Sequence, residues 1–343
     1  MIELTLEHKN KDGQVINYNF NPKNKDLPTD NIFAIIGNNG SGKTKLIKDI
    51  FTAISNENVN NEEISIKESN ISKAIHLSFN SLDEPLKSIG ENLAVSYKDI
   101  KNKNLIKNNL EIIKEDKNKA TLFWLEVYKY NFIFQDVFKD YANIYYSDFE
   151  EYKEIIDIEL TEGLDGKDIF SKYNFYKSIL DIYDKSSPGE KVVILGLTYI
   201  IANINNQTVV LLDEPELYLH PQMISIYINS IINIINKYDT ICILTTNSPI
   251  ILQEMNHHNV YKCKNSNGLV LESIKQRTFG ENLSNITDDV FKFNIKSTNF
   301  YNTLSNKKSE ELKEILNSDY IGSEGRFYIR LLISEKEDFW RNN

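Results

Sequence analysis

Gly37-Asn38-Asn39-Gly40-Ser41-Gly42-Lys43-Thr44 lies between the apolar run Ile32-Phe33-Ala34-Ile35-Ile36 and a helix predicted over about residues 43–55. Small residues allow the backbone amides of such a loop to curl around a phosphate group, and the start of the helix adds its positive dipole end. Lys43 would then reach the β- and γ-phosphates of ATP, and the Thr44 hydroxyl would bind Mg²⁺. A chance match in a glycine-containing turn is the alternative, which the flanking strand and helix disfavour. The nucleotide-binding residues predicted by this P-loop are Asn38, Asn39, Gly40, Ser41, Gly42, Lys43 and Thr44.

A second pattern, Val209-Val210-Leu211-Leu212-Asp213-Glu214-Pro215-Glu216, is an apolar strand that ends in carboxylates. In a P-loop protein this arrangement lets Asp213 hold Mg²⁺ through water and lets Glu214 polarise the attacking water. By itself the pattern fits a surface turn with two acids equally well, but its position behind the P-loop favours the catalytic interpretation. His220, shortly downstream, fits a capping or core position as well as a site position.

Ser186-Ser187-Pro188-Gly189-Glu190 stands before a helix predicted over residues 189–205 and before the acidic strand. Such a stretch can be an ordinary N-cap and turn. Its place in the chain makes it resemble the signature motif of ABC ATPases, in which a serine and helix-N-terminal amides contact the γ-phosphate held by an opposite subunit. The resemblance assigns this role to Ser187 and Gly189, while Ser186 stands where the motif usually has leucine. It therefore implies a site shared between two copies of the chain.

A fourth stretch, Leu244-Thr245-Thr246-Asn247-Ser248-Pro249, ends a strand predicted over residues 240–246. Asn247 occupies a position where related ATPases commonly carry histidine. An asparagine amide can hydrogen-bond a γ-phosphate or the attacking water, but it cannot be protonated. We therefore expect Asn247 to act beside Glu214 in catalysis and to make turnover slow.

Two parts of the nucleotide site stay open at this point. Tyr18, Phe20 and Phe33 are all candidates for stacking on adenine, and the sequence singles out none of them. A Q-loop glutamine would be expected near Asn80-Ser81, after a strand predicted over residues 73–79.

The order of these segments predicts an α/β fold with an ABC-type P-loop nucleotide-binding head, made of N-terminal antiparallel strands plus a mostly parallel sheet with flanking helices. Residues 1–20 predict two strands joined by a turn at residues 10–13, and the polar residues 56–70 predict a loop. Aromatic residues at helical spacing from Phe123 to Tyr141 predict a long amphipathic helix. We expect a head of residues 1–90 and 181–295, an inserted helical lobe of residues 91–180 and a C-terminal helical segment of residues 296–343.

Bulk properties exclude several classes of protein. The net charge of −10 and the pI near 5.2 exclude a basic protein that coats DNA. Met1-Ile2-Glu3-Leu4 does not begin a signal peptide, and no apolar run is long enough to span a membrane. Cys242 and Cys263 lack the spacing of a disulfide framework or a zinc site. We expect a cytoplasmic protein without membrane partners.

Together the four motifs resemble the ABC-like ATPases near the SMC and OLD groups. Three further stretches look like the ATPase subunit of Septu-type anti-phage systems, a kind of subunit that also accompanies an HNH nuclease in some retron systems. The resemblance covers residues 30–90 and 185–295 and implies an ATP-bound head-to-head dimer that regulates a partner HNH nuclease. Only about fifty residues follow Phe291, too few for the Toprim nuclease domain of OLD proteins, so we expect no nuclease centre in this chain. The three stretches are His76-Leu77-Ser78-Phe79-Asn80-Ser81-Leu82-Asp83, Ile250-Ile251-Leu252-Gln253-Glu254 and Thr278-Phe279-Gly280-Glu281-Asn282-Leu283.

Other hypotheses about the function of the chain remain. An SMC or DNA-repair ATPase would act on DNA, but residues 90–180 are too few for a long coiled coil. The cytoplasmic ATPase of a transporter is disfavoured by the residues that follow the acidic strand. A scaffold that binds ATP without turnover is the fourth reading, and it overlaps the first if Asn247 silences catalysis. Contact with nucleic acid stays open.

Overall fold

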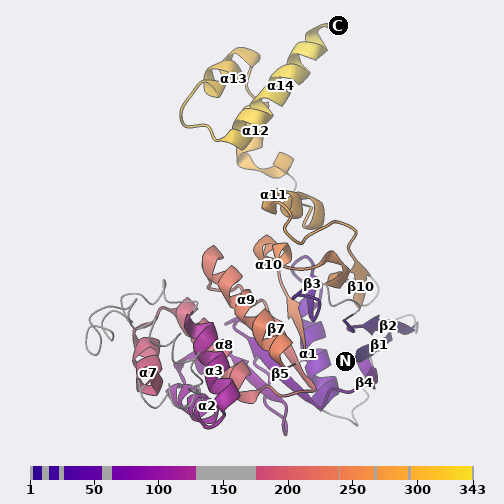
Figure 1. The fold of residues 1–343 in the computed structure, drawn as a ribbon. Coiled ribbons are helices and arrows are strands. Elements are labelled where there is room, and N and C mark those ends of the chain that lie inside the picture. The colour runs from indigo at the N-terminus through magenta and orange to yellow at the C-terminus, as the bar shows by residue number, and fades with distance from the viewer. Residues whose placement is uncertain are drawn as a thin grey trace. The chain divides into compact units, whose positions relative to one another are not determined.

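The computed structural model comprises two compact units, residues 1–286 and residues 287–343, each with its own apolar core (Figure 1). The described residues are 3–9, 15–22, 27–55, 64–128, 175–238, 240–265, 269–292 and 295–341. The division of the chain into a head, a lobe at residues 91–180 and a C-terminal segment from residue 296 stays a prediction.

A seven-stranded sheet forms the centre of the first unit. Apart from the antiparallel pair β9–β10, neighbouring strands run parallel. Every residue of β3, β7 and β8 is buried, as expected for parallel strands covered on both faces. The spatial order is β10 (Leu269–Ser273), β9 (Val260–Asn265), β3 (Ile32–Ile36), β8 (Ile241–Thr245), β7 (Thr208–Asp213), β5 (Lys73–Ser78) and β6 (Leu93–Ser96). β8 therefore lies between the strand that precedes the P-loop and the strand that ends in Asp213.

A second, antiparallel sheet has the order β2 (Val15–Asn19), β1 (Leu4–Lys9) and β4 (Ile64–Ser69). Helix α1 (Lys43–Ser55) buries one face against a core that includes residues of both sheets. This arrangement confirms the predicted fold class of N-terminal antiparallel strands plus a mostly parallel sheet with flanking helices. It also fixes the P-loop, because the loop joins a fully buried strand, β3, to a helix whose apolar face is packed into the core.

Helices gather around α8 (Pro188–Asn203) beside the parallel sheet (Figure 1). α8 is buried along almost its whole length, which its composition of Val, Ile and Leu requires. Its neighbours are η1 (Tyr97–Lys101), α2 (Lys103–Glu115), α3 (Lys117–Tyr128), α7 (Phe175–Lys185) and α9 (Pro221–Lys237). The remaining short elements of the unit are α10 (Pro249–Gln253), η2 (His257–Asn259) and α11 (Leu283–Asn285). Along the described parts of the chain, no helix is both long and apolar enough to cross a membrane.

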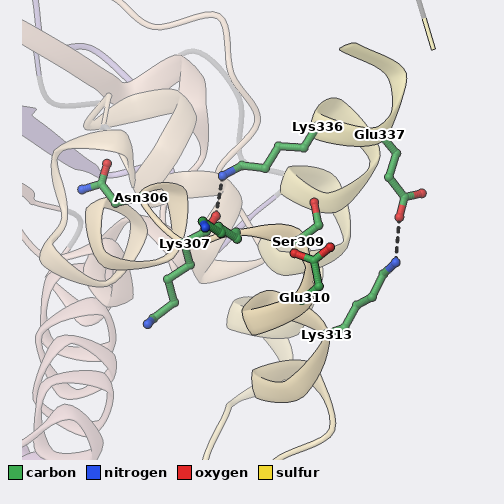
Figure 2. Close-up of a pocket in the computed structure, with 8 residues that line it drawn as sticks. Asn306, Lys307, Ser309, Glu310, Lys313, Lys336 and Glu337 are labelled. Carbon is green, nitrogen blue, oxygen red and sulfur yellow. Dashed lines mark hydrogen bonds and ion pairs between the residues drawn. The ribbon is translucent and has the colours of Figure 1, made fainter. Parts of the chain in front are cut away.

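The second unit is helical and has a small core of Leu304, Leu312, Ile329 and Leu332. Figure 2 shows a pocket lined by several lysines, between α14 (Ser323–Arg341) and the turn that joins α12 (Asn299–Ser305) to α13 (Ser309–Leu316). Its volume is about 710 Å³. Lys336 Nζ donates to the carbonyls of Ser305 (2.9 Å) and Lys307 (2.6 Å), and Lys313 Nζ pairs with Glu337 at 2.9 Å. These two lysines therefore join helices to one another within the unit. Its elements are η3 (Ile286–Val290), which begins at the boundary, η4 (Ile295–Ser297), α12 (Asn299–Ser305), α13 (Ser309–Leu316) and α14 (Ser323–Arg341).

Some local predictions need correction or lie outside the described residues. The loop predicted over residues 56–70 is wrong for its second half, where β4 forms. β4 is polar because it is an edge strand whose last three residues are exposed. The turn at residues 10–13 lies outside the described residues. So does the amphipathic helix predicted as far as Tyr141, except that Phe123 and Val127 are buried in α3.

The contact between α8 and α9 generates a stability prediction. A Cβ atom at Gly196 would come within 3.0 Å of the Tyr227 hydroxyl, which is buried and meets no hydrogen-bond partner within the described ranges. We expect Gly196→Ala to lower the free energy of unfolding by about 1–3 kcal/mol through overpacking. Tyr227→Phe removes the opposing oxygen, so the cost of Gly196→Ala should be smaller in that background. Chemical denaturation of both single variants and the double variant measures this, and equal costs in both backgrounds would contradict it.

Candidate nucleotide-binding site

The parallel register brings the ends of four strands, β3, β8, β7 and β5, to one edge of the large sheet. Thr245 at the end of β8 pairs with Ile35 of β3 on one side and with Asp213 of β7 on the other. Ser78 at the end of β5 pairs with Asp213 in turn. The P-loop, the acidic pair Asp213–Glu214 and the polar residues 246–248 after β8, here called the switch loop, therefore converge although they are far apart in the sequence.

The P-loop backbone adopts conformations that favour glycine. Gly40 has φ 79° and Gly42 has φ 97°, both in the left-handed region. Lys43 begins α1 and is 5% exposed, and its Nζ donates to the carbonyl of Gly37 at 2.8 Å. The loop thus wraps around its own buried ammonium group, as a cradle for an anion requires.

Asp213 lies at the centre of the site and is 2% exposed. Its Oδ1 accepts hydrogen bonds from Thr245 Oγ1 (2.5 Å) and Thr44 Oγ1 (3.3 Å). Burial raises the pKa of Asp213, and these two hydroxyl donors partly offset the rise. A hydroxyl and a carboxylate are oxygen ligands of the kind that Mg²⁺ prefers, and the ion usually takes only one or two carboxylates from a protein.

Glu214 follows with a strained backbone. Its φ of 48° lies in the left-handed region, which costs a residue other than glycine about 1–3 kcal/mol and is common at functional sites. Its N–H donates to Thr245 Oγ1 at 3.0 Å, and its Oε1 lies 4.0 Å from Lys43 Nζ. Burial and the neighbouring charge of Asp213 raise the pKa of Glu214. The strained turn therefore aims a carboxylate of raised basicity at the P-loop lysine.

The switch loop after β8 contacts this carboxylate. Asn247 Nδ2 donates to Glu214 Oε1 at 2.9 Å, so the structure brings together the two residues predicted to act in catalysis. The Asn247 backbone N–H and the Thr246 hydroxyl both donate to Glu216 Oε1 at 2.8 Å. Glu216 was given no role by the sequence analysis. Its only signal was its place as the last residue of Asp-Glu-Pro-Glu.

Asp83 is a second residue that the sequence analysis did not single out. It lies in the loop after β5, and its Oδ2 is buried with no hydrogen-bond partner in the part of the chain that the structure describes. Burial is the main cause of the raised pKa of Asp213 and of Glu214, and the charge of Asp83 adds to both shifts. A buried carboxylate oxygen without a partner is costly, and a divalent cation with its water ligands would relieve that cost. The donor set therefore fits Mg²⁺.

Ser187 and Gly189 lie at the N-terminus of α8. Ser187 is the exposed N-cap in a reciprocal capping box with Glu190, at 2.6 and 3.4 Å. Gly189 is buried, and a Cβ there would come within 3.0 Å of the Tyr218 carbonyl in the loop after β7. The contacts found for these two residues in the described chain are with α8 and with that loop, so the structure does not bring them to the P-loop of the same chain.

The loop after β7 also holds the residues downstream of the acidic pair. Tyr218 has φ 69°, its hydroxyl donates to Ser81 Oγ at 3.2 Å, and its ring lies 5.1 Å from that of Tyr97. His220 is the N-cap of α9, where Nδ1 accepts from the Gln222 N–H at 3.5 Å, so the capping alternative is the observed one.

The three aromatic candidates for adenine stacking all lie in the core. Phe20 and Phe33 are each 1% exposed and meet edge to face, with ring centroids 5.4 Å apart. The Tyr18 hydroxyl accepts from the Leu271 N–H of β10 at 3.1 Å. These side chains stabilise the two sheets against each other, and none presents a ring face to solvent.

Comparisons with known proteins give a distant relative and a set of fold similarities. No protein-family model matches the chain. Protein ea59 of Escherichia phage lambda is 27% identical over 344 residues, which cover 91% of this chain and 64% of the relative. The chain therefore spans slightly less than two thirds of that protein's length.

Similar solved structures are ATP-binding cassettes. One, a nucleotide-free cassette of an ABC transporter, has 15% identity and a TM-score of 0.37, covering 79% of this chain and 90% of that chain. Another, an ABC transporter cassette in its ADP conformation, has 14% identity and a TM-score of 0.40, covering 84% and 96%. CbiO1 from Clostridium perfringens, part of an ABC transporter complex, has 15% identity and a TM-score of 0.36, covering 79% and 88%. At these values nothing about activity or partners is transferred from them to this chain.

Proposed function

We propose that this chain is an ATP-binding and ATP-hydrolysing head that closes ATP between two copies of itself. The observation that carries the proposal is the convergence of Lys43, Thr44, Asp213, Glu214 and Asn247 at one edge of the parallel sheet. A phosphate cradle, two oxygen ligands for Mg²⁺, a strained carboxylate and an amide donor are the parts that phosphoryl transfer to water requires.

Each residue has a distinct task in this mechanism. Lys43 exchanges its contact with the Gly37 carbonyl for the β- and γ-phosphates, and the P-loop amides hold the β-phosphate. Thr44 and Asp213 would hold Mg²⁺, which would neutralise part of the charge that develops on the phosphates. Glu214 orients the attacking water and accepts its proton, for which a raised pKa is favourable. Asn247 keeps one amide N–H on Glu214 and offers the other to the water or the γ-phosphate.

Slow turnover follows from the chemistry of the switch residue. An asparagine amide donates and accepts hydrogen bonds but takes up no proton, so Glu214 alone handles the proton of the attacking water. The head is therefore suited to a long-lived ATP-bound state. That property fits a protein that licenses a partner better than one that drives continuous transport.

The second copy supplies the parts that one chain does not bring to its own P-loop. Ser187 is exposed at the start of a helix, where its hydroxyl can donate to an anion presented by another molecule and the positive end of the helix dipole adds to the attraction. Two heads facing each other would each place Ser187 and Gly189 on the γ-phosphate of the other. ATP would then act as part of the interface.

We further propose that the dimer regulates a separate HNH-type nuclease in anti-phage defence. The support is the resemblance of three stretches to Septu-type ATPase subunits. Two of them pack together here: Gln253 Nε2 donates to the Glu281 carbonyl at 2.8 Å, and the Gly280 N–H donates to the Gln253 carbonyl at 2.8 Å. Segments 250–254 and 278–283 thus form one continuous feature directly after the switch loop, where the state of the site could reach a partner.

The role of Lys43 gives a direct test of nucleotide binding. Lys43→Ala should abolish ATP binding in a folded protein, because the ammonium neutralises phosphate charge. Lys45→Ala on the same helix removes an equal charge from an exposed position and should leave affinity unchanged. Isothermal calorimetry with Mg²⁺·ATP measures both, and equal affinities for the two variants would remove the central claim.

The shared site can be tested by mixing two defective chains. Neither Lys43→Ala nor Ser187→Arg should hydrolyse ATP alone. A mixture should regain activity, because a heterodimer contains one site with an intact P-loop and an intact Ser187. Two differently tagged chains, co-purified and assayed for phosphate release, give the result. Failure to complement while wild-type heads still dimerise on ATP would exclude the shared site.

The partner proposal predicts no cleavage by the chain alone. With Mg²⁺ or Mn²⁺, and with or without ATP, the purified chain should leave DNA and RNA intact. Cleavage should appear when an HNH nuclease encoded beside it is added, and ATP should alter its rate. Metal-dependent cleavage by the single chain, abolished by a point mutation within it, would contradict this. Turnover stimulated by DNA without any partner would instead support an ATPase that acts on DNA.

A further inference from the structure

Glu216 connects the loop after β7 with the switch loop after β8. A single oxygen, Oε1, accepts from the Thr246 hydroxyl and from the Asn247 N–H, both at 2.8 Å. The same Thr246 hydroxyl accepts from the Ser248 N–H at 2.9 Å. Three consecutive residues of the switch are therefore held around one carboxylate that belongs to another segment.

The Glu216 side chain makes its hydrogen bonds to the switch loop, through the Thr246 hydroxyl and the Asn247 N–H. Oε2 is buried and has no hydrogen-bond partner among the described residues, so Oε1 and the switch loop provide the compensation for burial. Thr246 is fully buried and Ser248 is 8% exposed, which leaves the loop little freedom to shift. The carboxylate and the switch loop thus stabilise each other in one geometry.

The consequence reaches the reacting groups through Asn247. Its backbone is held by Glu216 while its side chain donates to Glu214 Oε1 at 2.9 Å. The direction of that side chain depends on the backbone position, because an asparagine has only two side-chain torsions. A shift of about 1 Å in such a residue can lower a rate by about 10²-fold.

We infer that Glu216 is a positioning residue that fixes the Thr246–Asn247 backbone so that the Asn247 amide faces Glu214. The inference rests on the proposed ATPase function and assigns the fourth residue of Asp-Glu-Pro-Glu a task distinct from that of the second. Glu216 acts through Asn247, and its own oxygens are occupied by the switch loop or buried.

The two hydrogen bonds to Glu216 Oε1 require an acceptor oxygen and do not require a negative charge. This difference permits a matched pair of variants. Glu216→Gln retains a carbonyl oxygen that can accept both hydrogen bonds. Glu216→Ala removes the acceptor. Glu216→Ala should lower kcat by about 10²-fold with little change in KM for ATP, because the phosphate cradle is untouched, and Glu216→Gln should recover most of the rate.

A double-variant cycle tests whether the effect passes through Asn247. Glu216→Ala combined with Asn247→Ala should be no slower than Asn247→Ala alone, because residues that act as one unit are not additive. Independent, additive losses would overturn the inference. So would equal losses in Glu216→Ala and Glu216→Gln, since that result would assign the task to the charge.

Hydrogen–deuterium exchange supplies a measurement that does not depend on turnover. In Glu216→Ala the amides of residues 246–248 should exchange faster than in wild type and in Glu216→Gln, while protection of α1 stays the same. Unchanged exchange in that segment would overturn the inference in a folded protein. A wild-type chain that neither binds nor hydrolyses ATP would refute the proposed function, and the exchange result would still decide whether Glu216 holds the switch.

Discussion

Asp213 Oδ1 accepts hydrogen bonds from Thr44 at the start of α1 and from Thr245 at the end of β8. These two contacts connect three segments that are far apart in the sequence. Asp213, which accepts both hydrogen bonds, is almost fully buried. A buried carboxylate needs such donors, since burial alone disfavours its charged form. The P-loop, the acidic pair and the switch owe their relative positions to this oxygen and to the parallel register around it.

Much of the fold could be predicted because local pattern and tertiary environment agree. The helix predicted over residues 43–55 and the apolar strand predicted before Asp213 match α1 and β7, since each has one unbroken pattern between clear end signals. The residues of the P-loop and Asp213, Glu214 and Asn247 could be proposed as site residues from their order along the chain, and the structure brings them close together. Their convergence needed only the rule that parallel strands end at the same edge of a sheet.

The remainder depends on contacts that no local pattern contains. β4 has a polar sequence because it lies at a sheet edge, and edge position is a property of topology. Tyr18, Phe20 and Phe33 were candidates for stacking on adenine because they are aromatic. In the structure all three side chains are buried in the core that the two sheets share. Glu216 was missed because its role depends on hydrogen bonds to the switch loop, and Asp83 because its charge acts on Asp213 and Glu214 from another segment. Their residue types alone are those of ordinary loop acids.

Tyr218 has a consequence for how the molecule can move. Its carbonyl abuts Gly189, its hydroxyl bonds to Ser81, and its ring packs on Tyr97. A displacement of the loop after β7 would therefore also displace the start of α8, the loop after β5 and helix η1. Tyr218 lies four residues after Glu214, so a movement of the Glu214 turn would reach these three segments through the contacts of one residue.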